Sequence, residues 1–219
     1  MTRRKRIFDI VVGSLLALVA LPVIAVLALV VASRFRASPF FVQYRIGLGG
    51  RQFRMLKLRT LRPETDPYVL KDDLPADAAP RLGRCLRRRH LDELPQLLLV
   101  PFGRLSLVGP RPKMPDAYEP VDPDYAERRV QVPQGCTGLW QVGLHSYDLP
   151  SASPQYDDFY LDHASIRLDL WILWRTALLV LRLGPPVGLD DVPLWITGPL
   201  AARRTEPVVE SASVTAEAS

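Results

Sequence analysis

The chain has 219 residues, a formal net charge of +5, two cysteines and three histidines. This length suits one domain with a real core, or a smaller domain joined to a membrane element, and it argues against two full domains. The cysteines, Cys85 and Cys136, form no CxxC motif, and the histidines show no metal-ligand spacing. A zinc site therefore has no support, and both cysteines are expected to be reduced.

Basic residues are concentrated in the first part of the chain. Residues 1–62 contain twelve Lys and Arg residues against a single acid, Asp9. Such an excess predicts an anionic partner, either nucleic acid or an anionic membrane surface. The excess surrounds a long apolar segment, and no nucleic-acid recognition motif is present. The sequence therefore favours a membrane, and no nucleic-acid partner is expected.

Residues 10–32 form an uncharged apolar run of 23 residues. A straight helix of that length spans about 35 Å, enough to cross a bilayer. A signal peptide is disfavoured because the run is too long and no small-residue cleavage site follows it. A straight span remains open, but Pro22 lies near the middle and predicts a bend, and basic residues flank both ends. We therefore favour a re-entrant helix that breaks at Pro22 and returns to the same membrane face.

A β-hairpin is predicted after this segment. Residues 40–45 and 52–60 have strand character, and the glycine-rich residues 47–50 between them suit a turn. The glycine spacing does not match a dinucleotide-binding loop. Lys57 and Arg59 are two residues apart, so they would project from one face of the strand. There they either contact a phosphate or remain solvated.

Residues 87–97 place two adjacent acids, Asp92 and Glu93, directly after a run of arginines. Nearby guanidinium groups lower the pKa of a carboxyl group and can also hold a polyanion. Asp92 could thus serve as an ionised nucleophile beside a bound diphosphate. The alternative is an ordinary helix start, with acids in the first turn and Pro95 tolerated there.

Two later segments complete the prediction. Residues 103–112 end in a rigid Gly-Pro-Arg-Pro corner that would hold the Arg111 guanidinium for phosphate recognition, unless the corner is only a structural turn. Residues 166–183 predict an amphipathic helix, either on the membrane surface with tryptophans at headgroup depth or buried in the core. The end of the chain, from about residue 203, is expected to be disordered.

Together these elements predict an α+β, monotopic membrane protein with an N-terminal re-entrant membrane helix, a small hairpin and surface amphipathic helices. Residues 1–36 are assigned to the membrane-inserted helix, residues 37–186 to a cytosolic catalytic domain and residues 187–219 to a C-terminal extension.

Six motifs then give the chain a family resemblance over roughly residues 5 to 183. In chain order they are Lys5-Arg6-x-Phe8-Asp9, Gln43-x-Arg45-x-Gly47-x-x-Gly50-x-x-Phe53, Lys57-x-Arg59-Thr60, Leu91-Asp92-Glu93-Leu94-Pro95-Gln96-Leu97, Ser106-Leu107-Val108-Gly109-Pro110-Arg111-Pro112 and Thr137-Gly138-Leu139-Trp140-Gln141. This set resembles the bacterial sugar transferases, the monotopic polyprenyl-phosphate phosphoglycosyl transferases. The chain resembles that family's minimal catalytic module.

The resemblance implies an enzyme at the cytoplasmic face of the bacterial inner membrane that starts exopolysaccharide or other glycan biosynthesis. It would transfer a sugar-1-phosphate from a UDP-sugar to polyprenyl (undecaprenyl) phosphate, releasing UMP through a covalent aspartyl-phosphosugar intermediate. By resemblance, Asp92 is the nucleophile and Glu93 helps to bind Mg²⁺. The expected substrate-binding residues share a position in these motifs or in the preceding arginine run, and are Lys57, Arg59, Arg87, Arg111 and Gln141.

Departures from the family pattern bear on specificity rather than on the acidic pair. His90 stands where the family usually has Ser or Thr, Lys113 follows the Gly-Pro-Arg-Pro corner, and His145 lies where a Gly-Arg pair is usual. These changes leave open a second interpretation, a catalytically silent membrane scaffold of the same fold. The sequence predicts no particular sugar and no particular oligomeric state.

Overall fold

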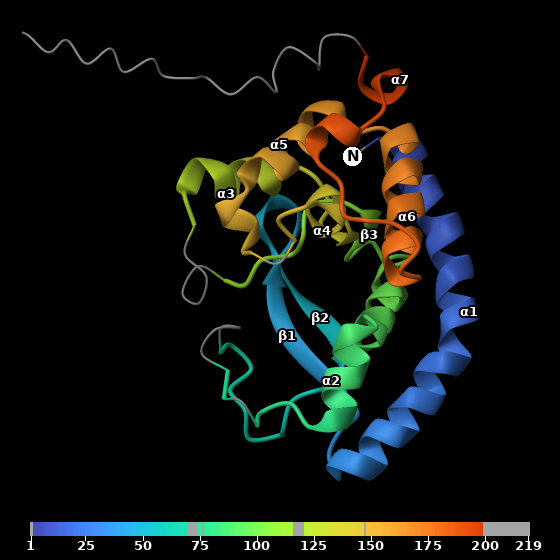
Figure 1. The fold of residues 1–219 in the computed structure, drawn as a ribbon, viewed down its shortest axis with the longest axis vertical. Coiled ribbons are helices and arrows are strands. Elements are labelled where there is room, and N and C mark those ends of the chain that lie inside the picture. The colour runs from blue at the N-terminus through green and yellow to red at the C-terminus, as the bar shows by residue number, and fades with distance from the viewer. Residues whose placement is uncertain (1, 70–73, 76, 116–120, 147, 199–219) are drawn as a thin grey trace, which may run out of the picture.

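The computed structural model describes residues 2–69, 74–75, 77–115, 121–146 and 148–198. It confirms a mixed helix-and-sheet fold with one long apolar helix at the N-terminus (Figure 1). The expected disorder from about residue 203 lies outside the described residues. The helices are α1 (Arg3–Phe35), α2 (Arg81–Arg88), α3 (Pro123–Arg129), α4 (Leu139–Val142), α5 (Pro154–His163), α6 (Ile166–Val180) and α7 (Leu194–Thr197), with 3₁₀ turns η1 (Leu48–Gly50), η2 (Leu91–Leu99), η3 (Pro150–Ala152) and η4 (Leu189–Asp191).

Helix α1 is capped at both ends and is not interrupted at Pro22. The Thr2 hydroxyl accepts a hydrogen bond from the Lys5 backbone N–H at 3.3 Å, and Arg36 ends the helix in a left-handed conformation. The predicted break at Pro22 is therefore wrong as an interruption of the helix. A proline removes one backbone donor and crowds the preceding turn, and a long helix can accommodate both by bending. Figure 1 shows α1 as a continuous curved rod.

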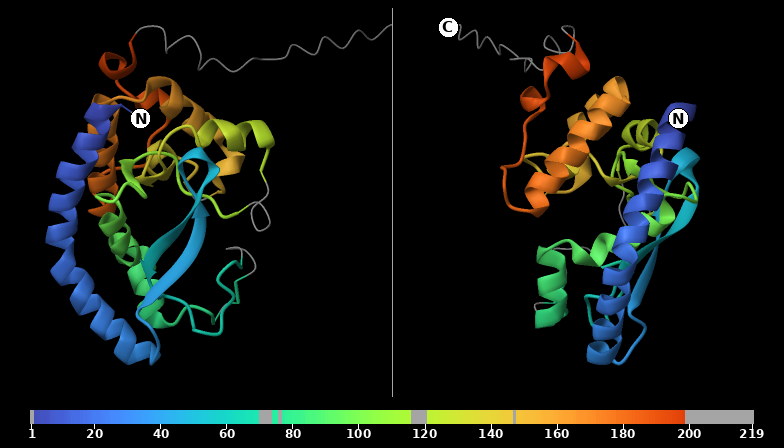
Figure 2. Two further views of the ribbon diagram at one scale, coloured as in Figure 1. Left: turned by 180° about the vertical axis from the view of Figure 1, so that it is seen from behind. Right: turned by 90° about the vertical axis from the view of Figure 1, so that its right-hand side faces the viewer.

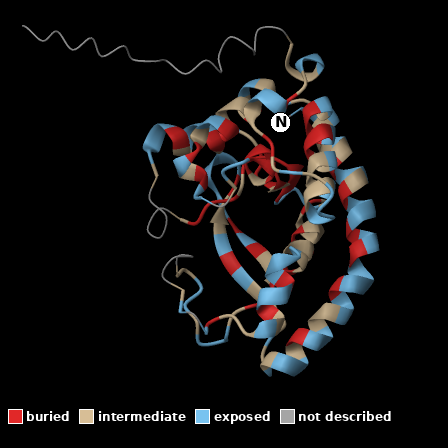
Figure 3. Cartoon of the chain, viewed as in Figure 1, coloured by how far each residue is buried: buried red, intermediate tan, exposed pale blue. Residues whose placement is uncertain are grey.

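One face of α1 packs against the rest of the protein along nearly its whole length. The buried residues of this face recur at helical spacing and are Asp9, Gly13, Ala17, Ala20, Ile24 and Val31. Several are small, so the helix approaches its neighbours closely: a Cβ at Gly13 would lie 2.5 Å from a methyl carbon of Val100. The opposite face exposes leucines, valines and isoleucines. Figure 3 shows buried and exposed positions alternating along this helix. Helix α1 thus has one side that packs against the protein and an apolar side that is exposed.

The predicted hairpin is confirmed. Strand β1 (Phe40–Ile46) pairs with β2 (Gln52–Leu58) in an antiparallel register from Phe40 opposite Leu58 to Ile46 opposite Gln52. Gly49 and Gly50 have positive φ angles in the connection, as the glycine-rich turn predicted. The hairpin directs Phe53 and Met55 into the core.

The core lies between a second, parallel sheet and helices α4, α5 and α6. Strands β3 (Ser106–Val108) and β4 (Gly135–Thr137) form that sheet, and Leu107, Val108, Leu139, Trp140, Leu168 and Ile172 are among the residues packed around it. Residues 166–183 were predicted to form an amphipathic helix, and α6 (Ile166–Val180) is partly buried in the core. Helix α6 buries Leu168, Trp171 and Ile172 but exposes Leu170 and Trp174.

The helical segment around the acidic pair breaks at His90 rather than at Pro95. Helix α2 ends at Arg88, His90 has a φ of 54°, and the 3₁₀ helix η2 then contains Pro95. Pro95 lies inside η2 and does not end this 3₁₀ helix. The left-handed conformation of His90 therefore separates α2 from η2, and nothing in the sequence predicts that conformation.

A buried polar network fixes the start of α1 to the body. The Lys5 ammonium donates to Asp169 at 2.7 Å and to the Val108 carbonyl at 3.1 Å. Asp9 accepts hydrogen bonds from the Ser106 hydroxyl at 2.8 Å and from the Leu107 N–H at 3.2 Å. Part of the basic cluster that the sequence analysis placed at the membrane thus serves internal structure.

Lys5→Met should reduce the free energy of unfolding by about 3–5 kcal/mol, because it leaves the fully buried Asp169 carboxylate without its cation. Arg4→Met removes an equal charge from an exposed neighbour and should change stability little. Denaturant unfolding of the detergent-solubilised protein measures both. Equal stabilities of the two variants would contradict a structural role for Lys5.

Candidate active site

The acidic pair lies in the first turn of η2, directly after the left-handed His90. The N–H groups of Arg89 and His90 close the last turn of α2, and the N–H of Glu93 bonds the His90 carbonyl at 3.3 Å to open η2. Asp92 is buried, with 7% of its surface exposed, and Glu93 is about one-quarter exposed at its side chain. The turn therefore points two carboxyl groups into the protein rather than into solvent.

Glu93 forms ion pairs with two basic side chains from distant parts of the chain. The Lys57 ammonium of β2 donates to Glu93 Oε1 at 2.6 Å, and the Arg111 guanidinium lies 3.4 Å from the same oxygen. Burial acts to raise the pKa of Glu93, but Lys57 and Arg111 together hold that pKa well below its usual range. Burial and Arg111 in turn lower the pKa of Lys57, against the opposing effect of Glu93. Glu93 is therefore held ionised.

The pKa of Asp92 is shifted in the opposite direction to that of Glu93. Burial raises its pKa, and the charge of Glu93 adds to this effect, although Lys57 and Arg87 oppose it. The expectation that the arginine run lowers the pKa of Asp92 is therefore wrong in direction. The reason is that burial of the Asp92 carboxyl group outweighs the lowering effects of Lys57 and Arg87 on its pKa.

Arg87 is fixed beside this turn by the hairpin. Its guanidinium Nε donates to the Thr60 hydroxyl at 2.9 Å. A Cβ at Gly83 would lie 1.9 Å from the Thr60 carbonyl oxygen, so glycine is what allows α2 to approach the end of β2. Arg59 has a different environment: its Nε donates to the Ser38 carbonyl at 2.8 Å, at the connection between α1 and β1. Of the two basic residues predicted to share a face, Lys57 reaches the acidic pair and Arg59 supports the hairpin.

Arg111 is held by a buried arginine that the sequence analysis missed. Arg129 of α3 is 1% exposed and donates to the Arg111 carbonyl at 2.6 Å. Its guanidinium also lies 3.1 Å from Asp157 of α5, which accepts a hydrogen bond from the Tyr125 hydroxyl at 2.7 Å. The neighbouring Arg128 is half-exposed and pairs with acids on the surface of α5, so no local signal distinguishes the two arginines.

Gln141 lines a small cavity next to the cations. The cavity is bounded by residues from the hairpin, η2 and the β3–β4 region, namely Met55, Lys57, Gln96, Arg111, Pro112, Gly135, Cys136 and Gln141. Both polar atoms of the Gln141 amide are buried, and neither has a hydrogen-bond partner among the residues that the structure describes. Buried polar groups normally have partners, so an unpaired amide beside two cations suits a polar, anionic ligand.

The remaining departures from the family pattern lie around the site rather than in it. The buried Lys113 accepts a hydrogen bond from the Ile46 N–H at its carbonyl, which ties the Gly-Pro-Arg-Pro corner to β1. His145 is exposed and lies 3.5 Å from Asp148. His90 supplies the turn before the acidic pair.

The acidic pair has the donor chemistry for a magnesium ion. Within the described parts of the chain, no group of three His, Cys, Asp or Glu side chains is arranged around a metal. Mg²⁺ needs no such group, because it is commonly held by one or two carboxylates together with substrate phosphates and water. The two bonds that Glu93 accepts from Lys57 and Arg111 both use Oε1, and adjacent Asp92 supplies a second carboxyl group. Asp92 and Glu93 therefore fit such an ion when substrate is present.

Comparison with known proteins finds similarity over most of the chain. The family model described as bacterial sugar transferase matches residues 1–183. A UDP-glucose:undecaprenyl-phosphate glucose-1-phosphate transferase of Caulobacter vibrioides is 38% identical over 197 residues, covering 86% of this chain and 71% of the relative. The exopolysaccharide production protein ExoY of Sinorhizobium fredii is 34% identical, covering 78% of this chain and 83% of the relative. A glucose-1-phosphate transferase of Klebsiella pneumoniae is 32% identical, but the match covers 39% of that longer protein.

Gln141→Leu should raise the free energy of unfolding of the ligand-free protein by about 1–3 kcal/mol, because it removes a buried amide that lacks partners. Gln134→Leu is the matched control. Its amide donates to the Arg129 carbonyl at 2.8 Å, so the same substitution there should destabilise by a similar amount. Thermal unfolding compares the two. A loss of stability in Gln141→Leu as large as that in Gln134→Leu would mean that the Gln141 amide is satisfied.

Proposed function

Because the chain belongs to the bacterial sugar transferase family and is a transferase, we propose that it transfers a sugar-1-phosphate from a UDP-sugar to undecaprenyl phosphate, with release of UMP. The donor and acceptor come from the names of its relatives, and one of them, ExoY, points to exopolysaccharide production. The observation that carries the proposal is the acidic pair itself, in which Asp92 is buried and Glu93 is paired with Lys57 and Arg111.

In the proposed mechanism Asp92 attacks the phosphorus atom that bears the sugar. A bond forms from a carboxylate oxygen of Asp92 to that phosphorus, and the bond to the bridging oxygen breaks, so that UMP leaves with the electron pair. An oxygen of undecaprenyl phosphate then attacks the same phosphorus and releases the Asp92 carboxylate. The covalent intermediate divides one difficult transfer into two steps. A raised pKa favours Asp92 as the attacking group, since a more basic carboxylate is a better nucleophile.

The cations around the pair would bind the diphosphate and stabilise its developing charge. Lys57 and Arg111 neutralise Glu93 in the free protein and are positioned to share their charge with substrate oxygens. Arg87 adds positive charge on the side of Asp92, and the Gln141 amide can bond a polar part of the donor in the cavity. A magnesium ion held by Glu93, with Asp92 nearby, would add charge neutralisation of the phosphate oxygens.

We also propose that α1 enters the membrane without crossing it and that the body lies on the cytoplasmic face of the inner membrane. Two contacts support this topology. Near its first turn, Lys5 of α1 bonds Asp169 of the body, and near its last turn Val31 is completely buried. A helix that crossed a bilayer would separate these two ends by about 30 Å of hydrocarbon. The exposed Arg3 and Arg4 suit the cytoplasmic side of a membrane.

Asp92→Asn should abolish catalysis, because it keeps the shape of the side chain and removes the charged oxygen that attacks. With UDP-sugar alone, the wild type should release about one equivalent of UMP in a burst and carry a phosphosugar on Asp92, as covalent catalysis requires. Intact-mass spectrometry and UMP release measure both. Glu93→Gln should slow both half-reactions and raise the Mg²⁺ concentration needed for activity.

Several outcomes would contradict this mechanism. Turnover with lipid acceptor but without burst or adduct, together with an active Asp92→Asn variant, would exclude a covalent aspartyl intermediate. A wild type with no UMP release for any UDP-sugar would instead favour a silent scaffold. Full activity after EDTA treatment would exclude Mg²⁺.

The topology predicts that a cysteine placed at Thr2 is protected from an impermeant thiol reagent in intact cells and labelled after lysis. A cysteine at the exposed Arg54 of the body should behave in the same way. Labelling of the Thr2 site from outside, with the Arg54 site still protected, would show that α1 crosses the membrane.

A further inference from the structure

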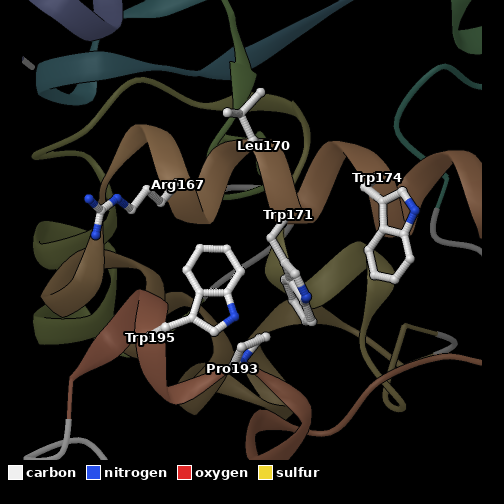
Figure 4. A pocket seen from close by; sticks show the side chains of 6 residues that line it. All are labelled: Arg167, Leu170, Trp171, Trp174, Pro193 and Trp195. Atoms are coloured by element: carbon white, nitrogen blue, oxygen red, sulfur yellow. The ribbon is translucent and has the colours of Figure 1, made fainter.

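An open apolar pocket lies on α6, away from the proposed active site. It is lined by two elements, α6 with Arg167, Leu170, Trp171 and Trp174, and the start of α7 with Pro193 and Trp195. Figure 4 shows the Trp195 and Trp171 rings side by side in the pocket, with Arg167 at one end and Trp174 at the other. Trp195 is 65% exposed and Trp174 is 53% exposed, an unusual display of large rings on one small surface.

We propose that this pocket binds an anionic phospholipid of the bilayer, with an acyl chain against the tryptophans and the phosphate at Arg167. Indole rings are favoured at the boundary between headgroups and hydrocarbon, because they combine an apolar body with one polar N–H. The residues that line the pocket include one cation and no acid. This combination of apolar rings and a single guanidinium matches a lipid with a negative headgroup.

The pocket depends on the chain that follows the region matched by the family model. The Arg175 guanidinium lies over the Trp174 ring at 5.5 Å and donates to the Pro185 carbonyl at 2.7 Å, which holds the turn after α6. Val187 then exchanges backbone hydrogen bonds with Val142 and Leu144, and its side chain is buried in the core. These contacts return the chain to α6 and bring Trp195 opposite Trp171. The pocket is therefore held in place by contacts with the folded body.

The location of the pocket supports a bilayer lipid as the occupant. The hydrogen bond between Lys5 and Asp169 places α1 and α6 next to each other, and the right-hand view in Figure 2 shows both helices on one side of the molecule. The apolar face of α1 exposes Val11, Leu15 and Leu18. The pocket and the outer face of α1 both expose large apolar side chains, and the proposal places both in lipid. It shares no lining residue with the cavity beside Lys57 and Arg111, so it is a poor place for the reacting phosphate of the acceptor.

Quenching of tryptophan fluorescence by brominated lipids tests this site directly. The protein is placed in vesicles of phosphatidylcholine that contain equal fractions of either dibromo-phosphatidylglycerol or dibromo-phosphatidylcholine. The emission due to Trp195 is obtained as the difference between wild type and Trp195→Phe. We expect this emission to be quenched more by the brominated anionic lipid, with an apparent enrichment of about fivefold for one Arg–phosphate contact near the membrane surface.

Arg167→Gln should abolish the preference for the anionic lipid. Arg128→Gln, which removes the same charge from the half-exposed surface of α3, should retain it. Equal quenching by the two brominated lipids in the wild type, or a preference that survives in Arg167→Gln, would overturn the proposal. Relief of quenching by a small amount of unbrominated undecaprenyl phosphate, but not by the same amount of phosphatidylglycerol, would assign the pocket to the acceptor and also overturn it.

The proposal rests on the membrane placement of this surface but not on sugar-phosphate transfer. Asp92→Asn should therefore show the same lipid preference as the wild type. Loss of UMP release with intact quenching would refute the proposed reaction alone, and normal UMP release without quenching selectivity would refute the lipid site alone.

Discussion

The ion pairs on Glu93 are the constraint on which the active site depends. A partly buried carboxylate is tolerated only when cations compensate for its loss of water, and here those cations come from β2 and from the Gly-Pro-Arg-Pro corner. The Lys57–Glu93 and Arg111–Glu93 contacts therefore join the hairpin, η2 and the β3–β4 region into one unit. Arg129 extends this unit to α3 and α5, since it bonds both the Arg111 carbonyl and Asp157. The geometry of the site is thus set by contacts over most of the body.

This set of contacts gives the two adjacent carboxyl groups different pKa values. Burial raises the pKa of Asp92, whereas Lys57 and Arg111 hold the pKa of Glu93 well below its usual range. Pairs of acids whose environments separate their pKa values commonly divide chemical roles between them. In the proposed mechanism, a more basic Asp92 suits attack on phosphorus, and an ionised Glu93 suits the binding of a cation.

In the proposed topology, helix α1 links this chemistry to the membrane. Its inner face carries small residues and buried polar anchors, Lys5 and Asp9, and its outer face is apolar. The anchors fix the rotation of the helix, because buried charged groups must meet their partners. A fixed rotation keeps the apolar side of α1 on the outside of the protein, where it faces lipid in the proposed topology, and it keeps the acidic pair on the protein side. In the proposed topology, the enzyme meets its proposed lipid-linked acceptor without a span across the bilayer.

The sequence by itself determined what depends on local pattern: the long apolar helix, the β1–β2 hairpin, the acidic pair and the ordered family motifs that indicate a sugar transferase. Tertiary structure decided what depends on distant neighbours. Arg128 and Arg129 are adjacent and chemically identical, yet one is half-exposed and the other is buried under Arg111. Lys57 meets Glu93 while Arg59 does not, and Asp92 has a raised pKa despite the arginines before it. Burial and ion pairing are set by residues far apart in the chain, so composition and spacing cannot encode them.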